Sequence, residues 1–212
     1  MANAEDSAAV HARMAQHLAI TAAARNAVIT GNLDEANAQG KLLRHLPLDG
    51  LPQNWQDRLS NLSSAARDLE AAPNIAMAGL AVGEIGQTCS ACHLATSGGP
   101  KIDGSGIPPQ TWTTDSHMPQ HLWASEWMWL GMLANNDEAF LRGAKTLSDE
   151  PLMQVAPTRP EWFAETEAEV HRIAKEMQAA SDLPAREALY GALLAQCGTC
   201  HMRLETDGAT PR

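Results

Sequence analysis

The chain alternates between long alanine-rich segments with interleaved apolar and polar positions and short segments that contain glycine and proline. Alanine favours helix, and the residues that favour strands (Val, Ile, Tyr and Phe) are sparse. Glycine and proline punctuate such segments and end helices. We therefore expect an all-α fold with eight helices. Their approximate ranges are 7–30, 33–46, 54–72, 75–93, a fifth beginning after Ser116, 137–147, 160–180 and 184–201.

The sequence also contains an internal repeat. Met-x-Gln-His-Leu occurs at 14–18 and again at 118–122, and Asp-Glu-Ala occurs at 34–36 and again at 137–139. Gly83 and Gly191 each precede a cysteine by six residues. The order and spacing match, which predicts two similar units in tandem.

A segment rich in Gly, Pro, Ser and Thr separates the two copies at 96–116. Such composition is typical of a loop. We place a domain boundary here, giving a first half, 1–107, and a second half, 108–212. Short links between successive helices favour antiparallel neighbours, so each half is expected to be an up-down-up-down four-helix bundle.

The four cysteines form two pairs, and each pair is followed at once by histidine. Cys-x-x-Cys-His is the attachment motif for c-type haem: the thiols add to the vinyl groups, and the histidine becomes the proximal iron ligand. The alternatives are a Cys₄ zinc site, a redox dithiol and structural disulfides. A zinc site would leave both histidines unexplained, and a thioredoxin-like dithiol requires a βαβ context. The predicted attachment residues are Cys89, Cys92 and His93, and Cys197, Cys200 and His201.

The net charge of −10 and the absence of a basic patch argue against a nucleic-acid-binding protein. An acidic surface suits a redox protein partner with a basic docking surface. No apolar run is long enough for a transmembrane segment. Residues 1–9 lack the features of a signal peptide. Because c-type haem is attached outside the cytoplasm, we expect a periplasmic protein whose export signal has been removed.

The position of the haem motif now distinguishes between kinds of cytochrome. In each half it lies at the end of the last predicted helix, and only eleven residues (212 − 201) follow His201. This placement resembles the class II cytochromes c, the cytochrome c′ family of four-helix bundles. The resemblance covers each half nearly end to end, although the family usually has a single bundle.

The resemblance implies that a residue early in the first helix faces the sixth coordination position of the iron. In an antiparallel bundle that part of the first helix lies beside the end of the last one. The repeated segment supplies His17 and His121 there, with Met14 and Met118 as alternatives on the same helix faces. An open, five-coordinate iron is the third possibility.

Other histidines are weaker candidates. In the family the distal residue often follows an arginine by four positions, as His17 follows Arg13, but the second half has His117 in that place. His11 and His117 are possible distal residues. His45 and His171 are expected at the surface, as are the acidic residues at 161–169. Three tryptophans of the second half are expected to pack in the core against haem or against the first half: Trp123, Trp127 and Trp129. The corresponding positions of the first half hold Ala19, Ala23 and Arg25.

Two covalently bound haem c groups with protein ligands on both sides predict an electron-transfer carrier or relay rather than an enzyme. His/His ligation predicts lower potentials than Met/His ligation. The alternative is a gas-binding protein for NO or CO with an open distal site. A tandem pair replaces the dimer common in the resembled family, so we expect a monomer.

Overall fold

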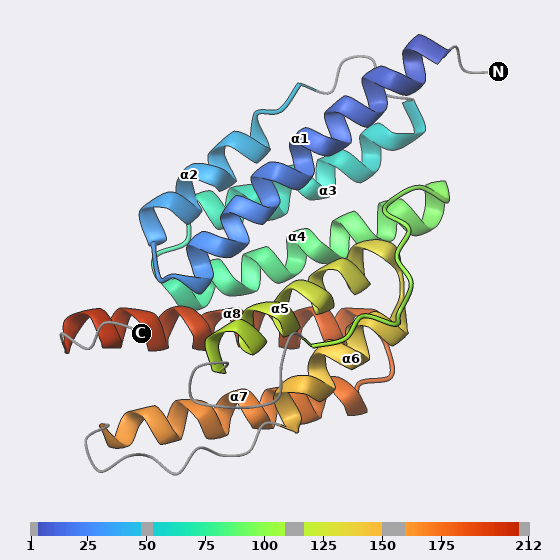
Figure 1. The fold of residues 1–212 in the computed structure, drawn as a ribbon. Helices are drawn as coiled ribbons and strands as arrows, with labels where there is room; N and C mark the ends of the chain where they lie inside the picture. Colours follow the sequence, from blue (N-terminus) through green and yellow to red (C-terminus); the bar gives the residue numbers. More distant parts are fainter. Residues whose placement is uncertain (1–3, 48–52, 109–116, 150–159, 208–212) are drawn as a thin grey trace.

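The computed structural model describes residues 4–47, 53–108, 117–149 and 160–207, and within these ranges it contains eight helices and no strand (Figure 1). The expected all-α class is confirmed, and each expected helix has a counterpart. None of the described helices is both long and apolar enough to cross a membrane. The helices are α1 (Ala4–Ile29), α2 (Leu33–Arg44), α3 (Gln53–Glu70), α4 (Ile75–Thr96), α5 (His117–Ala134), α6 (Asp137–Ser148), α7 (Glu161–Ala179) and α8 (Leu183–Thr206).

Side-chain caps set where several helices begin. Asn32 accepts a hydrogen bond from the Glu35 N–H at 3.1 Å, and Asn136 accepts one from the Ala139 N–H at 3.0 Å. These equivalent caps begin α2 and α6 directly after left-handed residues, Gly31 and Asn135, that end α1 and α5. Glycine and asparagine tolerate this conformation best, so the local sequence determines both turns.

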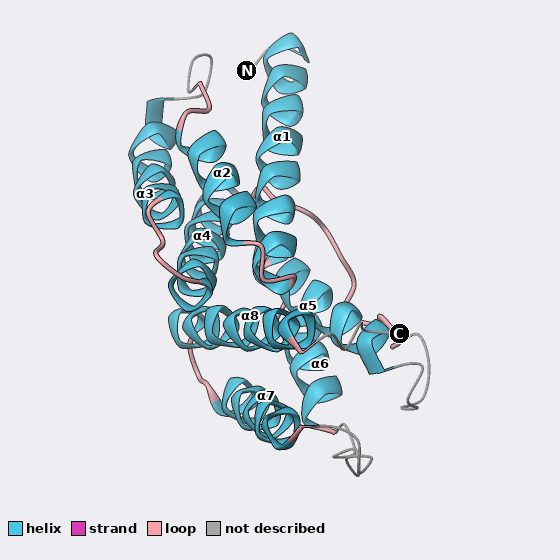
Figure 2. Cartoon of the chain, turned by 90° about the vertical axis from the view of Figure 1, so that its left-hand side faces the viewer, coloured by secondary structure: helices cyan, strands magenta, loops and turns pink. Residues whose placement is uncertain are grey.

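Helices that follow one another in sequence pack together within each half, and α1 and α5 also return to contact α4 and α8, respectively. The halves meet chiefly through α4 and α8, which lie side by side in Figure 1. Figure 2 shows that their axes run in different directions. Further contacts join α1 to α8 and α4 to α5. The first helix of each half therefore touches the last helix of both halves.

Glycines allow α4 and α8 to approach closely. A Cβ atom built on Gly83 would lie 2.6 Å from the carbonyl oxygen of Glu187, and one on Gly191 would lie 2.8 Å from that of Gly79. The two contacts are reciprocal, because Gly83 and Gly191 hold equivalent positions in the repeat. The repeated glycines thus form the junction between the halves.

The hydrophobic core is continuous across this junction. Trp129 is 1% exposed, and its ring stacks with that of Tyr190 at 6.0 Å between centroids. It also lies against Gly86 of the first half, where a Cβ would be 3.0 Å from the indole ring. The expectation that this tryptophan packs in the core against the first half is confirmed.

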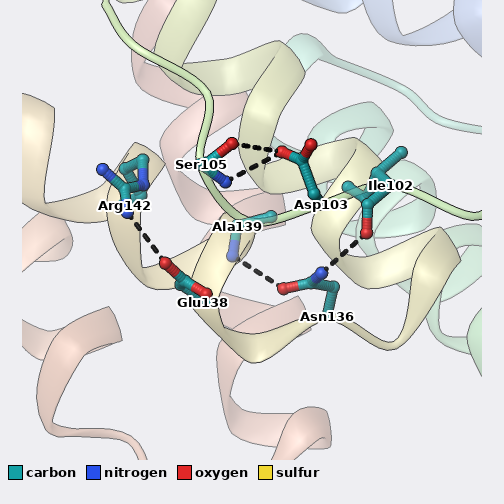
Figure 3. Close-up of polar contacts among 7 residues, drawn as sticks. All are labelled: Ile102, Asp103, Ser105, Asn136, Glu138, Ala139 and Arg142. Atoms are coloured by element: carbon teal, nitrogen blue, oxygen red, sulfur yellow. Dashed lines mark hydrogen bonds and ion pairs between the residues drawn. The ribbon is translucent and has the colours of Figure 1, made fainter.

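The segment that joins the halves is held against α6 (Figure 3). The Asn136 side chain donates to the carbonyl of Ile102 at 3.0 Å while it caps α6. Asp103 accepts from both the backbone N–H and the hydroxyl of Ser105. The expected boundary between residues 107 and 108 falls in this non-helical segment, next to residues that the structure does not describe.

The expectation that His171 lies at the surface is wrong, and so is the expectation for one of the acidic residues at 161–169, Glu167. His171 is only 7% exposed and Glu167 only 6%, whereas Glu161 and Glu165 are exposed as expected. His171 and Glu167 lie on the face of α7 that includes the buried Val170 and Ala174. The sequence shows a stretch rich in acidic residues but not which turn of the helix faces inward. His45, in contrast, is exposed as expected.

Candidate functional site

The first cysteine pair lies near the carboxyl end of α4 beside a narrow cavity of about 60 Å³, here called the first cavity. Side chains from α1 and α3 form its other walls, and Leu133 of α5 closes one end. The structure therefore brings together the five residues of this site named from the sequence and its resemblance: Met14, His17, Cys89, Cys92 and His93. Its lining includes Met14, His17, Trp55, Arg58, Cys89, Cys92 and His93.

His17 is buried, and one of its ring nitrogens has no hydrogen-bond partner in the described part of the chain. It is 7% exposed, and its Nε2 atom makes no hydrogen bond to any described residue. Burial, assisted by the charge of Arg13, lowers its pKa, which favours the neutral imidazole that binds iron. Arg13 itself donates to the carbonyl of Pro47 and does not line the first cavity. Met14 lies beside His17 in the same wall.

The ring of His93 is held from two sides. Its Nδ1 atom lies 2.8 Å from the carbonyl oxygen of Leu133, so the tautomer protonated at Nδ1 donates this bond and leaves Nε2 free for a metal. Gly99, with φ of 85°, passes over the ring, and a Cβ there would lie 2.7 Å from it. The side chains of Ser90 and Asn135 bond each other at 3.1 Å and fix the end of α5 on α4.

The second cysteine pair lies near the carboxyl end of α8 beside a much larger cavity of about 960 Å³, here called the second cavity. Its walls come from α5, α7, α8 and the last turns of α1. All of the second-half site residues named from the sequence line it: Met118, His121, Cys197, Cys200 and His201.

His201 is held as His93 is. Its ring bonds the carbonyl of Ile29, while burial and the proximity of His121 lower its pKa. Ile29 follows His17 by twelve residues, and Leu133 follows His121 by twelve. Each of α1 and α5 therefore carries a candidate distal histidine for its own half and a carbonyl that bonds the motif histidine of the other half. This exchange between the halves has no signature in the amino-acid sequence.

His117, a weaker candidate in the sequence, also lines the second cavity. Its ring lies 4.4 Å from that of His121 between centroids, and its Nε2 is 3.6 Å from Oε1 of Glu167. Two histidines therefore face this cavity from the first turn of α5. His11, the other weaker candidate, is exposed and lines neither cavity.

Three of the four thiols have environments that disfavour the thiolate. Burial raises the pKa of Cys89 and of Cys197 to about 12, and it also raises that of Cys92. A redox dithiol or a nucleophile requires the opposite shift. All four cysteines lie in the described part of the chain, and none forms a disulfide there. In the same residues, no three His, Cys, Asp or Glu side chains converge on a metal position.

Several residues of the two cavities escaped the sequence analysis. Arg25, Ile29 and Leu133 act across the junction between the halves, so only the tertiary structure reveals them.

Comparisons of this chain with protein-family models, with curated proteins and with solved structures find no match. The chemistry of the two cavities is therefore the basis for assigning a function.

Proposed function

We propose that this protein is a periplasmic di-haem c-type cytochrome that carries or relays electrons, built as two tandem four-helix bundles of cytochrome c′ type. The observation that carries the proposal is the buried, unpartnered Nε2 of His17, which shares a cavity with Cys89, Cys92 and His93. An imidazole nitrogen without a partner is costly to bury, and an iron ligand bond removes that cost.

The residues present fit haem c in their chemistry. Each cavity combines the two thiols of a Cys-x-x-Cys-His motif with the histidine of that motif, whose ring bonds a backbone carbonyl. A second histidine comes from the first helix of the same half. The two cysteine pairs line different cavities, which disfavours a shared Cys₄ zinc site. The raised pKa values of Cys89, Cys92 and Cys197 likewise disfavour a redox dithiol.

The two cavities differ in size. The second, at about 960 Å³, lies at the upper end of the range typical of cofactor sites, whereas the first, at about 60 Å³, is narrow. Binding of haem in the first cavity therefore requires Trp55, Leu59 and Leu62 of α3 to move away from α4. The two haems are accordingly not equivalent.

The protein would hold each haem through thioethers to its cysteine pair, with His93 and His201 as proximal ligands and His17 and His121 as distal ligands. Haem supplies one-electron chemistry at the iron. The hydrogen bonds from the His93 and His201 rings to backbone carbonyls would hold both rings in one orientation for the iron. The net charge of −10 favours a redox partner with a basic docking surface.

The first test is to express the chain with a cytochrome c maturation system and measure haem covalently attached to it. Two haems per chain are expected. Low-spin ferric EPR signals and no spectral change on adding CO to the reduced protein would indicate two His/His haems. Absence of covalent haem would overturn the proposal.

A substitution then tests the distal ligand of the first haem. His17→Ala removes the buried imidazole, so one of the two haems should become high-spin and bind CO. His11→Ala is the matched control, since His11 lies on the same helix, is exposed and lines neither cavity. If His17→Ala leaves both haems low-spin, Met14 becomes the ligand to test next and His17 is excluded.

The size of the second cavity favours one alternative, a gas-binding function at the second haem. A cavity of this volume leaves room for a small ligand beside the haem if His121 turns away from the iron. CO binding at one haem of the reduced wild-type protein, with the first haem remaining low-spin, would support this function over the simple relay.

A further inference from the structure

Helix α1 belongs to the first half, yet its last two turns line the second cavity, through Arg25, Asn26, Ile29 and Thr30. The bond from the His201 ring to the Ile29 carbonyl confirms that this part of α1 faces the second cysteine motif. Residues of the first half therefore complete the site of the second.

Arg25 is the unusual member of this group. It is 3% exposed, although it carries a guanidinium group. Its Nη2 atom pairs with the Glu126 carboxylate and donates to Asn26. The guanidinium also makes a hydrogen bond with the Tyr190 hydroxyl, yet its Nε and Nη1 atoms have no acceptor in good hydrogen-bond geometry among the described residues. Burying such donors without well-placed acceptors is costly, so an acceptor on the occupant of the cavity would stabilise them.

The chemistry of the cavity identifies that acceptor. The walls are mainly apolar, and the occupant proposed above carries two propionate carboxylates. We propose that Arg25 binds a propionate of the haem attached at Cys197 and Cys200. A charge-assisted N–H···O bond is the strongest kind that this buried group can make, and Glu126, being 43% exposed in its side chain, satisfies only one side of the guanidinium. This inference rests on the proposed function.

The repeat makes the interaction specific to one haem. Residues 17 and 121, and residues 29 and 133, are equivalent at an offset of 104, which pairs Arg25 with Trp129. Trp129 is buried and neutral, and it packs against Tyr190 rather than lining the first cavity. The buried charge of Arg25 would therefore act on the second haem, whereas the first cavity has a different cation, Arg58 of α3, on its wall. The Arg25 charge would favour the reduced state, which carries one more electron, and would raise the potential of the second haem.

The test is a spectroelectrochemical titration of the di-haem protein with three variants. Arg25→Gln should lower the midpoint potential of one haem, leave the other unchanged, and make the lowered potential depend on pH as the released propionate titrates. Arg25→Lys keeps the charge and should restore most of the potential. Arg44→Gln is the control that should shift neither haem, because Arg44 pairs with Glu70 and lines neither cavity.

A second measurement uses the wild-type protein, in case Arg25→Gln does not fold. In the reduced protein, nuclear Overhauser contacts should join the Arg25 Nε–H to the propionate methylene protons of one haem. Two covalent haems with no such contacts, or with both potentials unaffected by Arg25→Gln, would overturn this inference and leave the proposed function intact. A chain without covalent haem would instead overturn the proposed function.

Discussion

A close contact between α4 and α8 predicts the effect of one added methyl group. In Gly83→Ala the new Cβ would lie 2.6 Å from the carbonyl oxygen of Glu187 and 3.2 Å from Cα of Gly191. Carbon–oxygen contacts between backbones are ordinarily about 3.3–3.6 Å, so α4 and α8 must separate by roughly 0.7 Å or more. Both contacts are to backbone atoms, and no side-chain rotation relieves them.

The magnitude follows from two opposing effects. Replacing glycine by alanine inside a helix stabilises it by about 1 kcal/mol. Overpacking a tight core contact costs about 1–3 kcal/mol, and here the upper end applies because the obstacle is a helix backbone. We expect Gly83→Ala to lower the free energy of unfolding by about 2 kcal/mol.

The assay is denaturant unfolding followed by circular dichroism, with Gly86→Ala as the control. Gly86 lies on the same helix and gains the same helix propensity, but its added Cβ would meet only the side chains of Trp129 and Met132, at 3.0 and 3.3 Å. The Gly86 variant should therefore be the more stable of the two. Equal stabilities, or a more stable Gly83 variant, would refute the close crossing of α4 and α8.

Two further predictions concern a buried acid and a cap. Burial raises the pKa of Glu187 to about 8, so between about pH 5 and pH 8 the folded protein keeps a proton that the unfolded chain releases. The free energy of unfolding therefore falls as the pH rises, by at most about 1.4 kcal/mol per pH unit. In thermal unfolding, the stability of Glu187→Gln should match that of the wild type near pH 5 and exceed it near pH 8. A constant difference across that range would contradict the assignment. Asn136→Ala should destabilise by more than the roughly 1 kcal/mol expected of the cap-only change Asn32→Ala, because Asn136 also bonds the Ile102 carbonyl. Equal losses in chemical denaturation would show that the bond to Ile102 contributes nothing.

Much of this protein was predictable because its determinants are local. Alanine-rich segments, with glycine, proline or asparagine at their ends, predict the eight helices to within a few residues. The Cys-x-x-Cys-His motifs and the repeated Met-x-Gln-His-Leu segment named the residues that line the two cavities. Their role in holding haem stays a prediction. The helices and the motif residues can be identified from the sequence because helix propensity, capping and motif spacing depend only on neighbours in sequence.

The relation between the halves was decided by tertiary structure alone. The sequence shows that Gly83 and Gly191 are equivalent, but not that they meet at the crossing of α4 and α8. It likewise gives no reason to connect Leu133 with His93, forty residues away, or Arg25 with the second cavity. These contacts join residues far apart in sequence, and they arise from the close packing of two helices that only glycine permits. The sequence by itself determined the helices and the two motifs, whereas the packing of the halves determined that each site is completed by the other half.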